Sequence, residues 1–237
     1  MTRRDLLALM GVGAGALTLA GCGEKSSRYR QKITVVVDTP NGVRTGSSVI
    51  EVGYAEKPAW AQSFGGNGFW ARGEAVVVDI APGKTLYATL APMSSPESDI
   101  AWYQSWLIIS ALHAGVKSKP PIHLDKHDFS IAAHHEIGNL QLKIILPQSL
   151  YPIFITFADP GDPNSLINVN PGNLVVNYGT GYSLRSIIVE VTDERVTSEL
   201  EKRLKWLDHL DRYRSDYSNP FTGTLPNEIG YLRIAAR

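Results

Sequence analysis

The chain has 237 residues, of which 43% are hydrophobic, and it contains five Trp and ten Tyr. This composition can supply an ordinary core and excludes global disorder. The 23 basic residues balance 23 acidic ones, so there is no electrostatic reason to expect binding to nucleic acid.

The N-terminal segment has the features of a bacterial lipoprotein signal peptide. A pair of arginines precedes an apolar run, residues 6–20. As a helix this run covers only ~22 Å, short of the roughly 30 Å hydrocarbon core of a bilayer. It ends in Leu19-Ala20-Gly21-Cys22, the form of a lipobox whose cysteine receives a diacylglyceryl group. We predict that residues 1–21 are removed and that a lipid on Cys22 anchors the mature protein at a membrane, facing the periplasm or the outer cell surface.

The lipidated cysteine is the only cysteine of the chain. Its acylation would leave no thiol for a disulfide, a thiolate metal site or a cysteine nucleophile. Thr2-Arg3-Arg4-Asp5-Leu6-Leu7 resembles the twin-arginine export motif, although alanine rather than lysine follows it. General export, an uncleaved N-terminal anchor, and either the inner or the outer membrane stay open alternatives.

The remaining chain divides into three predicted parts. Residues 22–30 are mostly polar without periodicity and are expected to form a flexible tether. Residues 31–213 alternate between strand-like and helix-like patterns without a repeat or a clear linker, which favours a single globular α+β domain. Residues 214–237 lose these patterns and are expected to form an irregular tail.

The first third of the domain is predicted to consist of antiparallel hairpins. The β-branched runs 33–38 and 49–54 are separated by a segment whose Asn41-Gly42 pair is a hairpin turn signal. A second pair of runs, 74–80 and 85–90, follows. The fold class expected from the whole chain is therefore an antiparallel β-rich α+β domain with about two main helices.

Between the two hairpins lies a segment rich in glycine and aromatic residues. Its four aromatic side chains are Trp60, Phe64, Phe69 and Trp70. In an exposed loop their flat apolar faces could stack on a sugar ring or lie against lipid. The alternative is that these side chains fold back over a sheet as part of the core.

Two helices are predicted. Ser95 is a suitable N-cap for the first, with Pro96 at its first turn, and the apolar residues 100–109 spread widely around it, so we expect it to be packed on more than one side. The second begins after Thr197 and has one apolar face, formed by Leu200, Leu204, Leu207 and Leu210.

Further strands are predicted in the second half of the chain. The strand-like runs are 140–146, 153–157, 174–178 and 184–191. Asp159 and Asp162 lie in a turn-rich stretch that approaches the composition of a calcium site, but its prolines favour a rigid turn in which the acids bind their own backbone.

A cluster of histidines and acids offers the densest set of chemically active side chains. If residues 123–127 are extended, His123, Asp125 and His127 share one face, and His134 and His135 follow shortly after. Imidazoles with a carboxylate can bind Zn²⁺ or another divalent metal. The second histidine of a zinc-protease helix is replaced by Asn139, and histidines in a polar loop are often only solvated.

Several segments of the chain resemble a proteobacterial family of conserved hypothetical proteins. They are Thr39 to Ser48, Gly73 to Asp79, Thr156 to Pro163, the Tyr178-Gly179-Thr180-Gly181 stretch and Val189 to Leu207, so the resemblance covers most of residues 30–210. It implies a protein or lipoprotein of unknown function and supplies no activity, ligand or catalytic residue.

Two hypotheses for the function follow. The first is a non-catalytic envelope lipoprotein that binds a protein or another envelope component through a sheet edge or the aromatic segment, without a cofactor. The second is a lipid-anchored, metal-dependent hydrolase that uses the histidine cluster.

Overall fold

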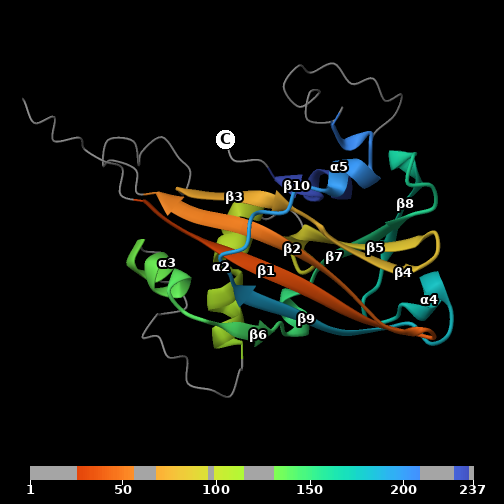
Figure 1. The fold of residues 1–237 in the computed structure, drawn as a ribbon, viewed down its shortest axis with the longest axis horizontal. Coiled ribbons are helices and arrows are strands. Elements are labelled where there is room, and N and C mark those ends of the chain that lie inside the picture. The colour runs from red at the N-terminus through yellow and green to blue at the C-terminus, as the bar shows by residue number, and fades with distance from the viewer. Residues whose placement is uncertain (1–25, 56–67, 96–98, 115–130, 209–226, 235–237) are drawn as a thin grey trace, which may run out of the picture.

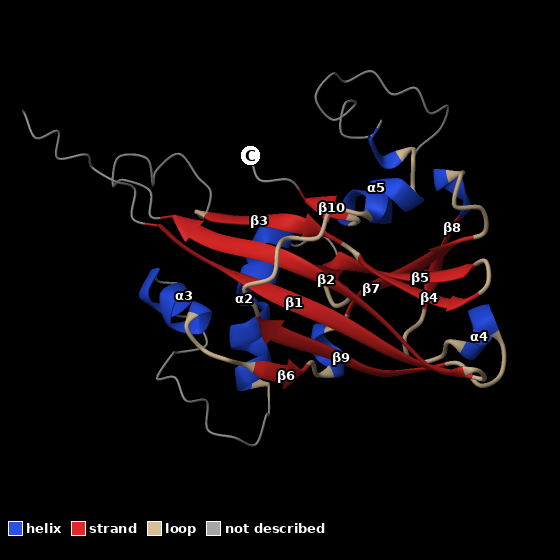
Figure 2. Cartoon of the chain, viewed as in Figure 1, coloured by secondary structure: helices blue, strands red, loops and turns tan. Residues whose placement is uncertain are grey.

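The computed structural model of the chain describes residues 26–55, 68–95, 99–114, 131–208 and 227–234. Two antiparallel β-sheets pack face to face. A helix lies beside the second sheet and covers the rest of the same face of the first sheet (Figures 1 and 2). The structure confirms the predicted fold class, an antiparallel β-rich α+β domain with hairpins toward its N-terminal side.

The first sheet is built around one long hairpin. Its strands, in spatial order, are β10 (Arg233–Ile234), β3 (Phe69–Glu74), β2 (Gly42–Ala55), β1 (Ser26–Thr39), β9 (Ser183–Val191) and β6 (Lys143–Ile145). The turn of the hairpin is Pro40-Asn41, and Gly42 follows with a φ of 99°, which glycine adopts without strain. Residues along β1 alternate between buried and more exposed positions, which defines an inner and an outer face.

The second sheet covers the inner face at the hairpin end of the first. It consists of β4 (Val76–Ala81), β5 (Lys84–Pro92), β7 (Pro152–Phe157) and β8 (Leu166–Val169), in that order. Only Ala75 separates β3 from β4, so the chain passes from one sheet to the other at this residue. The close approach of the sheets requires Gly46, because a Cβ there would lie 1.9 Å from the Val77 carbonyl oxygen.

Helix α2 (Ile100–His113) covers the inner face at the Ser26 end of the first sheet (Figure 1). Its N-cap is Asp99, whose carboxylate accepts a hydrogen bond of 3.1 Å from the Trp102 amide, so the predicted cap at Ser95 is wrong. Most of its side chains are buried, as expected for a helix packed on several sides. The shorter helices are α3 (Ile131–Gly138), α4 (Val175–Tyr178) and α5 (Leu200–Arg203), and the 3₁₀ turns are η1 (Gln148–Leu150), η2 (Pro163–Ser165) and η3 (Asn227–Tyr231).

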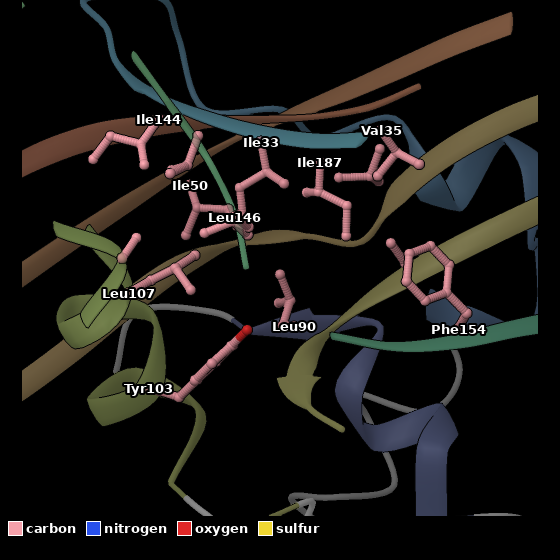
Figure 3. Close-up of a cluster of buried hydrophobic side chains, with 14 of the residues drawn as sticks. Ile33, Val35, Ile50, Leu90, Tyr103, Leu107, Ile144, Leu146, Phe154 and Ile187 are labelled. Carbon is pink, nitrogen blue, oxygen red and sulfur yellow. The ribbon is translucent and has the colours of Figure 1, made fainter. Parts of the chain in front are cut away.

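The main core lies between the two sheets and α2 (Figure 3). Aliphatic side chains from both sheets meet there, with Leu107 and Tyr103 contributed by the helix. The other face of the second sheet carries a second core, which α5 and η3 cover.

One polar pair interrupts the main core. The Gln31 side-chain amide donates to the backbone oxygen and to the side-chain oxygen of Gln104, at 2.9 and 3.0 Å. The Gln104 amide in turn donates to the Leu90 carbonyl oxygen at 2.7 Å. Both glutamines are buried, so α2 is bound to β1 and β5 by hydrogen bonds inside apolar surroundings.

Two predicted boundaries are wrong. The tether predicted for residues 22–30 is too long, because Ser26 to Arg30 already pair with β2 as the first part of β1. The tail predicted for 214–237 is not irregular throughout: β10 pairs with β3, and the Ala75 amide donates to the Leu232 carbonyl oxygen. Apolar burial explains the second correction, because Ile229 and Leu232 both lie in the second core.

Two predicted elements also differ from the structure. Residues 175–178 form the short helix α4 rather than a strand, with Leu174 and Tyr178 buried four residues apart. The helix predicted after Thr197 is interrupted: α5 ends at Arg203, the backbone leaves helical geometry at Leu204 (φ −114°, ψ 78°), and helical residues resume at Leu207 and Asp208. Its leucines at 200, 204 and 207 are nevertheless buried, as the pattern predicted.

Candidate functional site

The predicted metal ligands are only partly described by the structure. His123, Asp125 and His127 lie outside the described residues, whereas His134 and His135 both belong to α3. Neighbouring residues of a helix point in different directions, and accordingly His134 is buried and His135 is exposed. Within the described ranges, no three His, Cys, Asp or Glu side chains are grouped so that they could hold a metal ion.

His134 is enclosed by aromatic rings. Its ring centroid lies 5.6 Å from that of Tyr29, 6.0 Å from that of Tyr54 and 6.1 Å from that of Phe69. The side chain is fully buried, and neither ring nitrogen has a hydrogen-bond partner. Burial lowers the pKa of His134 to about 4, because the charged form would lose its hydration. The residue therefore packs as a neutral aromatic ring, and its nitrogens are not available to a solvent-accessible ion.

The predicted aromatic segment is also divided. Trp60 and Phe64 lie outside the described residues, and Phe69 and Trp70 are strand residues on opposite faces of β3. Phe69 packs on the inner face, with its ring 4.9 Å from that of Tyr54. Trp70 lies on the outer face against Gly53, where a Cβ would come within 2.3 Å of the indole. For these two residues the alternative of packing over a sheet is the correct one.

At the Ser26 end of the first sheet, the strand register aligns side chains in two rows on the outer face. One row crosses β1, β2 and β3 as Arg28, Gly53 and Trp70. The next row is Arg30, Glu51 and Arg72. We call the outer surface formed by these two rows the cationic face.

Glu51 organises the cationic face. Its carboxylate is buried and accepts from Arg30 Nε at 3.2 Å and from Arg72 Nη2 at 2.8 Å. A buried carboxylate requires such partners, because an unpaired charge in this position would lose its hydration without compensation. Three guanidinium groups and one carboxylate leave the face with an excess of positive charge.

A hollow of about 340 Å³ opens beside this face. It lies between the first part of β1, the end of α3 and the chain that follows β9, and its polar lining includes Arg28, Arg30, Glu51, His135, Asn139 and Asp193. We call it the polar hollow. The side chains of His135 and Asn139 are in contact with each other, with Nδ1 of the imidazole 3.1 Å from the amide nitrogen.

The chain direction explains why the hollow exists. The register of β9 along β1 ends at the pair of Val191 and Gln31, so β1 extends beyond its neighbour. The Thr192 amide still donates to the Arg30 carbonyl oxygen at 3.0 Å. Arg30 Nη1 then donates to the carbonyl oxygens of Asp193 and Glu194, at 3.2 and 3.3 Å, as the chain turns across the outer face (Figure 1). The space that a longer β9 would occupy stays open next to Arg28.

Arg28 is the most available cation at this site. Its side chain is exposed, and it has no ion pair within the part of the chain that the structure describes. Arg30 and Arg72, in contrast, are both held by Glu51. The hollow and the face together offer guanidinium and amide donors to a polar or anionic group.

Sequence reasoning missed the arginines of this site. Arg28 and Arg30 fell within the predicted tether because the stretch is short and polar. Their signal is alternation, since Ser27, Tyr29 and Gln31 between and beside them are the buried residues of a strand.

Comparison of the chain with protein-family models, curated proteins and solved structures returns no match. The resemblance to a proteobacterial family of conserved hypothetical proteins therefore stays a prediction. In the described parts of the chain, no helix has both the length and the apolar character needed to cross a bilayer.

Proposed function

We propose that the protein is a bacterial envelope lipoprotein, tethered to a membrane through Cys22, whose folded part binds an envelope component and catalyses no reaction. The lipobox supports the tether, and the polar hollow beside the cationic face supports binding. The hollow presents donors and ion pairs, which suit recognition of a polar or charged group.

The start of β1 is the observation that carries this proposal. Ser26 is already paired with Ala55, and it lies only four positions after Cys22. Four residues span at most about 14 Å, so a lipid on Cys22 would hold the Ser26 end of the sheet next to the lipid headgroups. The cationic face and the hollow are at that same end.

The metal-dependent hydrolase has less support. It relies on a cluster in which His134 would be one ligand, and this imidazole is enclosed by Tyr29, Tyr54 and Phe69. A metal site on the other histidines would have to do without it. Elemental analysis of the purified protein after equilibration with Zn²⁺ tests this hypothesis, and a stoichiometric metal lost in a His123→Ala variant would favour it over simple binding.

The tether is tested by metabolic labelling with palmitate. The wild-type chain should incorporate label and sediment with membranes, and Cys22→Ser should incorporate none, because serine has no thiol to accept the diacylglyceryl group. A Glu24→Gln variant changes a residue two positions after the cysteine without removing the thiol, and it should be labelled like the wild type. Label that persists in the serine variant would refute the anchor.

A further inference from the structure

We propose that the cationic face rests on the phosphate groups of anionic phospholipids, with the polar hollow receiving a headgroup. This inference builds on the proposed tether, which would bring the face to a membrane. The proposal names the surface that the folded part contacts once it is there.

The charge of the face is the first argument. Arg30 and Arg72 flank the single carboxylate of Glu51, and Arg28 lies in the neighbouring row, which has no carboxylate of its own. Asp193 on the rim of the hollow adds one further negative group, and the neighbouring Lys32 is neutralised by Glu194 at 2.6 Å. The excess is positive, which complements an anionic bilayer surface.

The arrangement of the arginines is the second argument. The Glu51 carboxylate holds the Arg30 and Arg72 side chains on either side of it, so these cations are fixed in place on the face. Arg28 is exposed and keeps its guanidinium donors for a ligand. A planar guanidinium matches phosphate oxygens in a two-point contact, which favours phosphate over a neutral headgroup.

Trp70 is the third argument. Its indole lies across Gly53, the residue that pairs with Arg28 in the same row, and it is only half-buried. An indole in this setting has a packed apolar side and a side open to solvent. Tryptophan favours the interface of bilayers because its ring is apolar and its N–H is polar.

The size and lining of the hollow indicate that it binds the headgroup of a lipid. A volume of about 340 Å³ with a mainly polar lining suits a phosphate and its polar substituent. Acyl chains would leave the buried carboxylate and the arginines without compensation for their lost hydration, so they would stay in the bilayer. The contact is therefore a headgroup contact, in addition to the acyl anchor on Cys22. A single acyl signal combined with a basic patch binds membranes more firmly than either alone.

The test is vesicle flotation of the full chain carrying Cys22→Ser, which removes the acyl anchor. Partitioning onto phosphatidylcholine vesicles is compared with partitioning onto vesicles that also contain phosphatidylglycerol. We expect a preference for phosphatidylglycerol that falls about fivefold in Arg28→Ala, since an arginine at an anionic surface contributes a factor of this size. Arg28→Lys keeps the charge but loses the two-point contact, so its preference should fall between those of the parent chain and Arg28→Ala. Arg28 is exposed, so these variants should fold, which circular dichroism checks.

Arg44→Ala is the matched control. Arg44 is an exposed residue of the same hairpin, close to its turn and far from Ser26, and its loss changes the net charge equally. The preference should be unchanged in this variant. Equal losses in the Arg28 and Arg44 variants, or no preference in the parent chain, would overturn the proposal. Displacement from vesicles by inorganic phosphate at constant ionic strength would also overturn it, because it would indicate a site for soluble phosphate.

The outcomes separate this inference from the proposed anchor. If palmitate labels the protein but Arg28→Ala leaves the preference for phosphatidylglycerol unchanged, the anchor is supported and the lipid contact of the cationic face is rejected. If palmitate does not label the protein but the preference for phosphatidylglycerol depends on Arg28, the anchor is rejected and the lipid contact of the cationic face is supported.

Discussion

At the scale of single residues, His134 differs most from its expected role. Two adjacent histidines in a polar stretch indicated solvated side chains or metal ligands, but α3 places one ring inside an aromatic cluster and the other in solvent. Both nitrogens of the buried ring lack partners, which is rare for buried polar atoms. Only the neutral ring tolerates this position, so His134 makes the stability of the fold sensitive to acid.

Because of His134, the free energy of unfolding should decrease as the pH falls. In the unfolded chain the imidazole binds a proton below its ordinary pKa of 6.5, whereas in the folded chain burial lowers the pKa to about 4. Between these values the unfolded state binds more protons, so stability present above pH 6.5 is lost progressively toward pH 4. The loss should reach roughly 3 kcal/mol, about 2 kcal/mol of it by pH 5. Urea unfolding at pH 7.5 and pH 5 measures it.

His134→Phe should remove this part of the pH dependence, because phenylalanine fits among aromatic rings and binds no proton. His135→Gln is the control, since it removes the neighbouring exposed imidazole and leaves His134 in place. Tyr29, which packs on His134, does not titrate in this range, because burial raises its pKa further above its ordinary value. An equal loss of stability in the wild type and in His134→Phe would contradict the assignment.

At the scale of elements, local pattern predicted the strands better than the helices. The β1–β2 and β4–β5 hairpins follow directly from β-branched runs and turn residues. The turn at Asp159 and Asp162 is also confirmed, because their carboxylates accept from the Gly161 and Asn164 amides. Hairpins and turns depend mainly on interactions between residues that are close in sequence, so sequence patterns predict them.

Elements that depend on distant partners were missed. Helix α4 has the composition of a strand, and its burial against the rest of the core overrides that preference. Helix α5 was expected to be long, but its N-terminus depends on Glu74, which lies on β3 more than a hundred residues earlier. The site was hidden for the same reason, because Arg28, Glu51 and Trp70 meet only through the register of three strands.

Glu74 should be important for the stability of α5. Its buried carboxylate accepts from the Glu199 amide at 2.6 Å and from the Leu200 amide at 3.1 Å, and it therefore caps a helix that has no side-chain cap of its own. Glu74→Gln should lower the free energy of unfolding by about 1.5–3 kcal/mol, because the neutral amide oxygen is a weaker acceptor than the carboxylate and the amide NH₂ cannot accept at all. Urea unfolding at neutral pH measures this change.

The control for this prediction is Glu199→Gln. The Glu199 side chain is exposed and pairs only with Lys202 among the contacts described, so its loss should cost less than about 1 kcal/mol. Equal effects of the two substitutions would show that Glu74 is not the cap.

At the scale of the whole molecule, the first and the last segments that the structure describes complete the first sheet and the second core. β1 forms the centre of the first sheet, and β10 adds the edge strand next to β3. Just before β10, Leu232 is fully buried in the second core, against the side of the second sheet that faces α5. The sequence could not indicate the burial of Leu232, because the segment around it is too short to show a periodic pattern of apolar residues.

Leu232→Ala should destabilise the protein by about 2–5 kcal/mol, because it leaves a cavity in the second core. Ile234→Ala is the matched control, since Ile234 is in the same segment but only half-buried, and it should cost less. Thermal unfolding of both variants compares them. A Leu232 variant as stable as the Ile234 variant would show that the C-terminal segment is dispensable.

The buried amides of Gln31 and Gln104 have a mechanical consequence for α2. Aliphatic contacts have no direction, so leucines and isoleucines alone would allow the helix to shift along the sheet with little penalty. A shift by one turn, about 5.4 Å, would carry the Gln104 amide away from Gln31 and from the Leu90 carbonyl oxygen and leave these groups unbonded in hydrocarbon surroundings. The helix therefore has one stable axial position, and force applied along it is transmitted to β1 and β5 together.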